Sequence, residues 1–296
     1  MASYIAAKPL VRLGDVELRE PAAPSVTAEL EPLGIDGAVL DGLLSPAECA
    51  SLVGAAEAAG FSFWDPAGED DGQRRLRNAE TIEFMGDTLC SSLWARLAPF
   101  VPPRVEVREG EDRHSLELDG AWVAAGLNEH LLINRYAGGG HFAPHADGST
   151  EVSFDERSLY TVLVYLNDVG EGGATQLLRG DQSDATCADG GAAPLVTREG
   201  AVVHAVRPVA GRAVVYWHET LHAGQPVGAA ECKYCLRTDV MYRRDPPLAT
   251  APADAEAYEL YQRARSLEGA GDAMAALDCL RRAKRLSPLI ARAYRL

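Results

Sequence analysis

Residues 211–227, GRAVVYWHETLHAGQPV, contain an H-E-x-x-H pattern that runs from His218 to His222. On a helix, two histidines four residues apart share one face and bind one zinc ion, as in zinc proteases. Here the run before His218 is rich in Val, Tyr and Trp, which is typical of a β-strand. A glycine and a proline follow within four residues of His222, so fewer than two helical turns would fit. The stretch therefore predicts a strand that ends near His218, and a zinc metalloprotease through His218, Glu219 and His222 is the minor alternative.

The region from about residue 120 to 245 has the same β character. Runs rich in Val, Leu, Tyr and Trp alternate there with Gly-rich turns. Short strands separated in this way predict a mainly β barrel or sandwich. The polar segment 179–194 shows no such pattern and is expected to be an unstructured loop or an insertion.

Helical segments are predicted before this β core. Residues 45–60 begin with an N-cap serine, a proline at the first helical position and a glutamate three residues after the cap, and they end at a glycine. A second helix is expected over residues 86–98, and a short strand over 35–44. Residues 1–33 have little periodicity and are expected to be a loosely ordered lead-in.

Residues 253–296 are predicted to form a helical hairpin. Small residues recur where the two helices would touch, and a proline follows them: Ala257, Ala264, Ala276, Ala283 and Pro288. This spacing resembles one tetratricopeptide repeat. Because a single repeat cannot bury its own apolar face, we expect the hairpin to dock on the core, with binding of a protein partner as a second role.

The composition limits the classes of partner. The 296 residues carry a formal net charge of −15, which argues against nucleic-acid or anionic-membrane binding. No run of about 18 apolar residues is present, so no transmembrane helix is expected, and the first residues lack a signal-peptide pattern. Six scattered cysteines indicate reduced thiols. We therefore expect an intracellular protein in the cytoplasm, with the nucleus as the alternative compartment.

Upstream, residues 136–148, YAGGGHFAPHADG, contain a His145-Ala146-Asp147 pair. In an extended segment residues i and i+2 point to the same side, so both can bind one ion. A third ligand must come from elsewhere, and His222 follows a β-type run directly. Two imidazoles and one carboxylate on one face leave the opposite positions open, which favours non-haem Fe(II) and oxygen chemistry over a closed zinc site.

A 2-oxoglutarate cosubstrate would need one more feature. Its keto-acid end chelates iron, and its distal carboxylate requires a buried cation at the far end of the pocket. Lys233 begins the strand-like run KYCLRTDVMY, and Arg237 lies four residues later on the same face. Lys233 is the first choice and Arg237 the alternative.

Together, these stretches resemble the prolyl 4-hydroxylase-like Fe(II)/2-oxoglutarate dioxygenases over roughly residues 35–245. The matching pieces occur in the family's order: RYAGGGHFAPHADG, YTVLVYLNDVGEGGATQLL, GRAVVYWHETLHAGQPV and KYCLRTDVMY. The resemblance implies a double-stranded β-helix, or jelly-roll, with N-terminal helices. It places a dioxygenase domain at residues 34–246, with the metal-site core at about 128–243. The segment 179–210 is longer than the family's minimal core, which leaves the substrate undefined.

Carried over by position, the resemblance gives each residue a role. His145, Asp147 and His222 would ligate iron. Lys233 would pair with the distal carboxylate of 2-oxoglutarate. The hydroxyls of Tyr136 and Tyr165 would face the cosubstrate pocket, and those of Thr161 and Thr175 are weaker candidates for it.

The implied activity is hydroxylation of a C–H bond. The resemblance implies Fe(II), 2-oxoglutarate and O2, release of succinate and carbon dioxide, and ascorbate as the reductant that keeps iron in the ferrous state. A prolyl or other residue of a peptide or protein is the expected substrate, and a small molecule is the alternative. A non-catalytic scaffold that uses the barrel and the hairpin is the competing hypothesis from another class.

Overall fold

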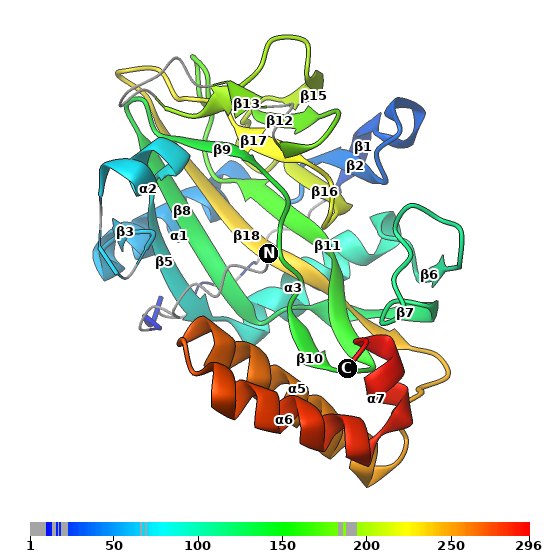
Figure 1. Ribbon diagram of the computed structural model, residues 1–296. Coiled ribbons are helices and arrows are strands. Elements are labelled where there is room, and N and C mark those ends of the chain that lie inside the picture. The colour runs from blue at the N-terminus through cyan, green and yellow to red at the C-terminus, as the bar shows by residue number, and fades with distance from the viewer. Residues whose placement is uncertain are drawn as a thin grey trace.

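The computed structural model describes residues 10–13, 16, 18, 23–65, 67–68, 70–182, 186–187 and 194–296. Two antiparallel sheets pack face to face and form a jelly-roll barrel, with helices at its flanks (Figure 1). The mainly β fold predicted from the sequence is therefore confirmed. Among the helices of these ranges, none is both long and apolar enough to cross a membrane.

The large sheet follows the order β1-β2-β16-β11-β18-β8-β5-β3, and β6, β7 and β10 pair beside this path. The bounds of its strands are β1 Ser25–Glu29, β2 Gly37–Asp41, β3 Ser62–Phe63, β5 Glu80–Met85, β6 Arg104–Val107, β7 Gly120–Leu127, β8 His130–Ala137, β10 Glu151–Ser153, β11 Glu156–Tyr165, β16 Ala213–Trp217 and β18 Cys232–Arg244.

The small sheet follows the order β15-β12-β17-β9-β4. Its strands are β4 Arg77–Asn78, β9 His141–His145, β12 Thr175–Leu178, β15 Val202–Val206 and β17 His222–Gly224. Side chains from both sheets meet in one apolar cluster: Tyr136, Tyr165, Leu177, Val206, Tyr216 and Cys235. Along each strand, side chains point alternately into and out of the space between the two sheets. Polar residues at inward positions therefore gather in that space.

Two helices cover the outer face of the large sheet. They are α1 (Pro46–Ala59) and α3 (Asp87–Leu97), and their apolar residues join the main core. The predicted capping box of α1 is present, because the Ser45 side chain accepts from the Glu48 backbone and Glu48 accepts from the Ser45 backbone. The remaining short helices are α2 (Asp71–Leu76), which contacts β4 and β9 of the small sheet, η1 (Glu31–Leu33) and η2 (Ala98–Phe100).

Two sequence expectations need correction. Residues 25–33 of the expected lead-in are ordered, since β1 pairs with β2 and η1 follows it. This edge strand buries little of its surface, so its pairing left almost no apolar pattern in the sequence. The segment 179–194 is not wholly unstructured either, because β13 (Thr186–Cys187) pairs with β14 (Val196–Thr197). Other parts of both segments lie outside the described residues.

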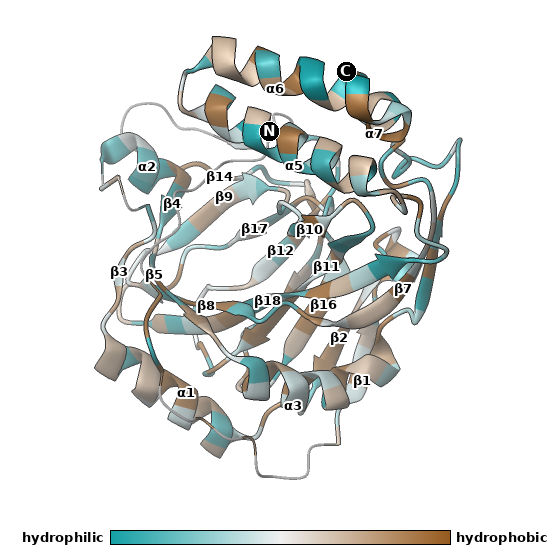
Figure 2. Ribbon diagram, turned by 90° about the horizontal axis from the view of Figure 1, so that it is seen from below, coloured by the Kyte–Doolittle hydropathy of each residue, from teal (hydrophilic) through white to brown (hydrophobic). Residues whose placement is uncertain are grey.

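The C-terminal residues form helices, as predicted. They are α5 (Pro252–Gly269), α6 (Ala273–Leu286) and α7 (Pro288–Ala293). All four alanines expected at the helix contact are buried. Figure 2 shows these helices on the side of the barrel opposite to α1 and α3. The relation to a tetratricopeptide repeat stays a prediction.

The helix α5 docks on the barrel through Glu151 of β10. One oxygen of this carboxylate, Oε2, accepts from Tyr258 Oη at 3.1 Å, Gln262 Nε2 at 2.5 Å and Arg265 Nη1 at 3.1 Å. Phe154 packs in the same cluster as the helices. The hairpin therefore docks on the core, as the sequence argument required.

Replacing Glu151 by alanine is expected to loosen this docking. The change leaves three donors without their common acceptor, which should cost about 1–3 kcal/mol of stability. Hydrogen exchange should accelerate in α5 more than in α1. Glu259→Ala, on an exposed position of the same helix, is the matched control and should leave exchange unchanged. Equal exchange in both variants would contradict a docking role for Glu151.

Candidate metal centre

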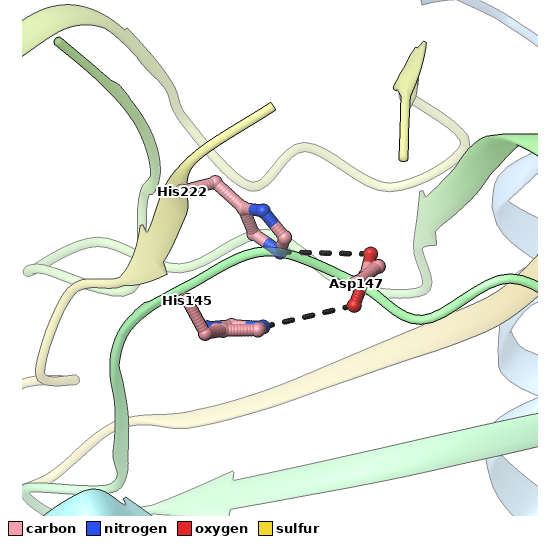
Figure 3. A group of neighbouring side chains, drawn as sticks. All are labelled: His145, Asp147 and His222. Carbon is pink, nitrogen blue, oxygen red and sulfur yellow. Dashed lines mark ion pairs between the residues drawn. The ribbon is translucent and has the colours of Figure 1, made fainter. Parts of the chain in front are cut away.

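Two strands of the small sheet bring the predicted ligands together. His145 ends β9, His222 begins β17, and the two residues are direct partners in the antiparallel pair. Asp147 follows two residues after His145, as the H-x-D pattern predicted. One ligand atom from each side chain lies within 4.8 Å of the others. Figure 3 shows the three side chains directed toward one another.

Hydrogen bonds at the far side of each imidazole fix its orientation. His145 Nδ1 donates to the Ala143 carbonyl at 2.8 Å, and His222 Nδ1 donates to the Thr220 carbonyl at 2.9 Å. Each Nε2 therefore faces the Asp147 carboxylate, 3.7 Å away in both cases. A backbone acceptor on one ring nitrogen is the usual partner of a metal-binding histidine. Two imidazoles and a carboxylate thus fit a divalent ion.

The charges around the site keep the ligands in their metal-binding forms. Burial lowers the pKa of His145 to about 3, so the ring is neutral at pH 7. Burial by itself raises the pKa of the Asp147 carboxyl, but Arg237 and the two histidines outweigh it and hold the pKa well below its usual value. The carboxylate is therefore ionised throughout the physiological range.

The first histidine of the H-E-x-x-H pattern lies elsewhere. His218 is buried, and its ring contacts Thr161 Oγ1 at 2.9 Å and Ser158 Oγ at 2.7 Å. It follows the end of β16 in a turn, so His218 and His222 do not share a helical face. The zinc-protease alternative is therefore wrong, as the β-type run before His218 indicated.

A cavity of about 760 Å³ opens beside the three ligands. Lys233 and Tyr136, which are partners across β18 and β8, line it together with Thr175 and Arg237. The Lys233 ammonium is buried, donates to the Gly173 carbonyl at 2.7 Å and lies 5.4 Å from the Tyr136 ring centroid. Burial lowers its pKa. It has no carboxylate partner in the part of the chain that the structure describes.

The other candidate cation is differently placed. Arg237 Nη2 lies 3.1 Å from Asp239 Oδ1 and 3.8 Å from Asp147 Oδ1. Four residues of strand separate Arg237 from Lys233, which is about 13 Å. Arg237 is thus beside the metal ligands and already paired, whereas Lys233 lies farther along the cavity with its charge uncompensated.

The structure places Tyr165 behind the cavity wall. Its hydroxyl donates to Thr175 Oγ1 at 2.7 Å, and Tyr165 itself is fully buried and absent from the lining. Its ring centroid nevertheless lies 5.2 Å from Lys233 Nζ, so the predicted role of Tyr165 beside the cosubstrate stays a prediction. Tyr136 does line the cavity, and burial raises the pKa of its hydroxyl to about 12, so it stays protonated as a donor.

Sequence reasoning missed two neighbours of the site. The Phe142 ring stacks on His145 with 3.5 Å between centroids. Arg77 of β4 is buried beside Phe142, and its Nη2 donates to Asn134 Oδ1 at 2.7 Å. Phe142 lies inside the quoted motif of residues 136–148, and the alternation of side chains along a strand could have predicted that it lies near the site. Arg77 is about 70 residues away, and only the pairing of β4 with β9 brings it to the site.

Comparisons with known proteins find similar solved structures. A prolyl-4-hydroxylase of Pseudomonas putida is 14% identical over 73% of this chain and 96% of that chain, with a TM-score of 0.43. A prolyl hydroxylase of Trichoplax adhaerens, in complex with a hypoxia inducible factor peptide fragment, is 17% identical over 73% of this chain and 86% of that chain, with a TM-score of 0.43. The carbocyclase SnoK from nogalamycin biosynthesis is 14% identical over 74% of this chain and 87% of that chain, with a TM-score of 0.43. No curated protein matches the sequence.

The family model that matches is described as the 2OG-Fe(II) oxygenase superfamily, and the match spans residues 131–238. All three ligands and Lys233 fall within this span. The segment includes β9, β11, β12, β16 and β17 and most of β8 and β18, and each of these strands contributes residues to the cavity lining. The part of the chain that resembles the 2OG-Fe(II) oxygenase superfamily is thus the part that carries the three candidate ligands and Lys233.

Proposed function

We propose that this protein is an Fe(II)- and 2-oxoglutarate-dependent dioxygenase that hydroxylates a C–H bond and releases succinate and carbon dioxide. The observation that carries the proposal is the convergence of His145, Asp147 and His222 beside a cavity that the buried Lys233 also lines. Iron, when bound, would supply the oxidising chemistry. Ascorbate is proposed as the reductant that keeps it ferrous.

Different side chains would hold the metal and the cosubstrate. His145, Asp147 and His222 would hold the metal by three positions and leave the cavity side open. Lys233 would receive the distal carboxylate of 2-oxoglutarate, since its charge is buried and lacks a counterion among the described residues. Tyr136, which lines the cavity next to Lys233, would donate its hydroxyl hydrogen to the same cosubstrate, and Thr175 would assist with Tyr165 behind it.

Burial of this end of the cavity also serves the chemistry. Lys233 and His222 are each 4% exposed, so these two side chains are shielded from bulk solvent. A dry site strengthens charge interactions and protects reactive species from side reactions. The three ligands and Lys233 include no nucleophile paired with a general base. The geometry thus suits positioning of a metal and a dicarboxylate.

The substrate belongs to the proposal as well. We expect a prolyl or other peptidyl residue, on the strength of the motifs quoted above, with a small molecule as the alternative. The α5–α6 hairpin is proposed as a site where a protein partner could be recruited. Glu151, which lines the cavity, is held by α5, so this hairpin also borders the substrate side of the cavity.

A mass-balance experiment tests the reaction class and the substrate class together. Iron-loaded enzyme is supplied with 2-oxoglutarate, isotopically heavy O2 and a library of proline-containing peptides. Hydroxylation adds one heavy oxygen to a peptide, and 2-oxoglutarate loss rises in step. If only added small metabolites stimulate turnover, the peptide assignment fails while the reaction class stands. If iron-loaded enzyme neither binds nor consumes 2-oxoglutarate, the scaffold hypothesis replaces the enzyme.

A further inference from the structure

His218 has no role in the proposed metal set, although it stands four residues from a ligand. It is 4% exposed, and its ring nitrogens both have partners. Its backbone is tied to the same region, because its carbonyl accepts from the Asp147 N–H at 3.1 Å and its own N–H donates to the Leu159 carbonyl at 3.0 Å. A buried histidine fixed at both ring nitrogens is held in one orientation.

The direction of each hydrogen bond around His218 can be assigned. The Thr161 hydroxyl donates its single hydrogen to Asp147 Oδ2 at 2.7 Å, because an ionised carboxylate can only accept. The contact of Thr161 Oγ1 with His218 Nδ1 at 2.9 Å must then be a bond in which Nδ1–H donates. With Nδ1–H as the donor, Nε2 is the acceptor of the neutral imidazole tautomer.

The far side of the ring completes the chain. Ser158 Oγ lies 2.7 Å from His218 Nε2 and must donate to it. Ser158 Oγ in turn accepts from the Thr150 backbone N–H at 2.7 Å. The bonds therefore run one way, from Thr150 through Ser158, His218 and Thr161 to Asp147. They begin and end on the same four-residue loop, 147–150.

We propose that His218 is a positioning residue, which through Thr161 orients the Asp147 carboxylate so that Oδ2 is occupied and Oδ1 is left for the metal. This inference rests on the proposed metal site. Oδ1 accepts no hydrogen bond from the described residues, and it lies 3.7 Å from His145 Nε2 and 3.8 Å from Arg237 Nη2. Oδ2, by contrast, also accepts a longer bond of 3.4 Å from the Tyr216 hydroxyl. Partners that orient a metal ligand typically change metal affinity by about 10- to 100-fold when they are removed. The first histidine of the pattern is thus an indirect support of the ligand set.

Paired substitutions separate hydrogen bonding from packing. The amide nitrogen of Asn occupies the place of Nδ1, so His218→Asn keeps a donor for Thr161. The amide of Gln reaches the place of Nε2, so His218→Gln contacts Ser158 and leaves Thr161 without its donor. Thr161→Val removes the hydroxyl at nearly constant size, and Thr161→Ser keeps it. His204→Gln, on β15, is the matched control at a histidine outside the chain of bonds.

The readout is the dissociation constant of Mn(II), followed by the magnetic resonance signal of the free ion, with thermal unfolding to confirm that each variant is folded. We expect H218Q and T161V to weaken Mn(II) binding about 10-fold or more. H218N, T161S and the His204 control should stay near wild type. Folded H218Q and T161V with wild-type affinity would overturn the positioning role. Wild-type protein that binds no Mn(II) would overturn the metal site and this proposal with it.

Discussion

Asp147→Ala abolishes iron-dependent turnover of 2-oxoglutarate, if the three-residue site is the metal centre. Asp147 supplies the only carboxylate of the set and lies 3.7 Å from the Nε2 atoms of both histidines. Two neutral imidazoles alone bind a divalent ion weakly and fix no open face. The expected loss exceeds the about 10- to 100-fold that follows removal of a ligand's hydrogen-bond partner. Succinate formation and Fe(II) binding should fall together.

Glu219→Ala is the control that makes this result specific. Glu219 would be the general base of a zinc protease, but it is exposed and holds no position among the three ligands. We expect Glu219→Ala to form succinate at the wild-type rate. Full turnover by D147A, or its loss in the Glu219 variant, would contradict the assignment of the metal site.

Lys233→Met should weaken 2-oxoglutarate binding severely while leaving the metal bound. Removing one partner of a buried, hydrogen-bonded charge pair costs about 2–5 kcal/mol, which is about 30-fold or more in affinity. The KM for 2-oxoglutarate should therefore rise by at least that factor. Arg237→Met should act differently, because Arg237 lies beside Asp147 and Asp239, and its loss should lower Fe(II) affinity and kcat.

A cosubstrate analogue checks the cause of the Lys233 effect. 2-Oxopentanoate has the keto-acid end of 2-oxoglutarate and a methyl group in place of the distal carboxylate. It should bind wild type and Lys233→Met with similar affinity, since the missing ion pair cannot be formed in either case. If Lys233→Met leaves the KM for 2-oxoglutarate unchanged and Arg237→Met raises it, the distal carboxylate binds at Arg237.

Much of the fold could be predicted from short stretches of the sequence. The α1 capping box, the β-type runs and the H-x-D pair each depend on neighbouring residues, and the structure contains all of them. β1 was missed because it is an exposed edge strand whose stability comes from pairing with β2. β13 and β14 are only two residues long, which is too short for any periodicity.

The residues of the site likewise include some that short stretches of sequence predicted and some that they did not. The order of the motifs along the chain predicted the three ligands and Lys233, because each follows or begins a recognisable strand. The contacts of Arg77 and Phe142, and the chain through His218, depend on how β4, β9 and β11 are placed beside one another. Such register between distant strands is not encoded in any single stretch, so the hydrogen bond from the Tyr165 hydroxyl to Thr175 Oγ1 could not be predicted from the sequence.

Succinate formation by anaerobically purified, Fe(II)-loaded protein, started by adding 2-oxoglutarate, ascorbate and air, tests the central claim most directly. Slow turnover without the prime substrate is sufficient for the measurement. We predict succinate that requires iron, 2-oxoglutarate and O2 together, and that a metal chelator prevents. Absence of succinate, together with no measurable binding of 2-oxoglutarate to the iron-loaded protein, would contradict the dioxygenase assignment.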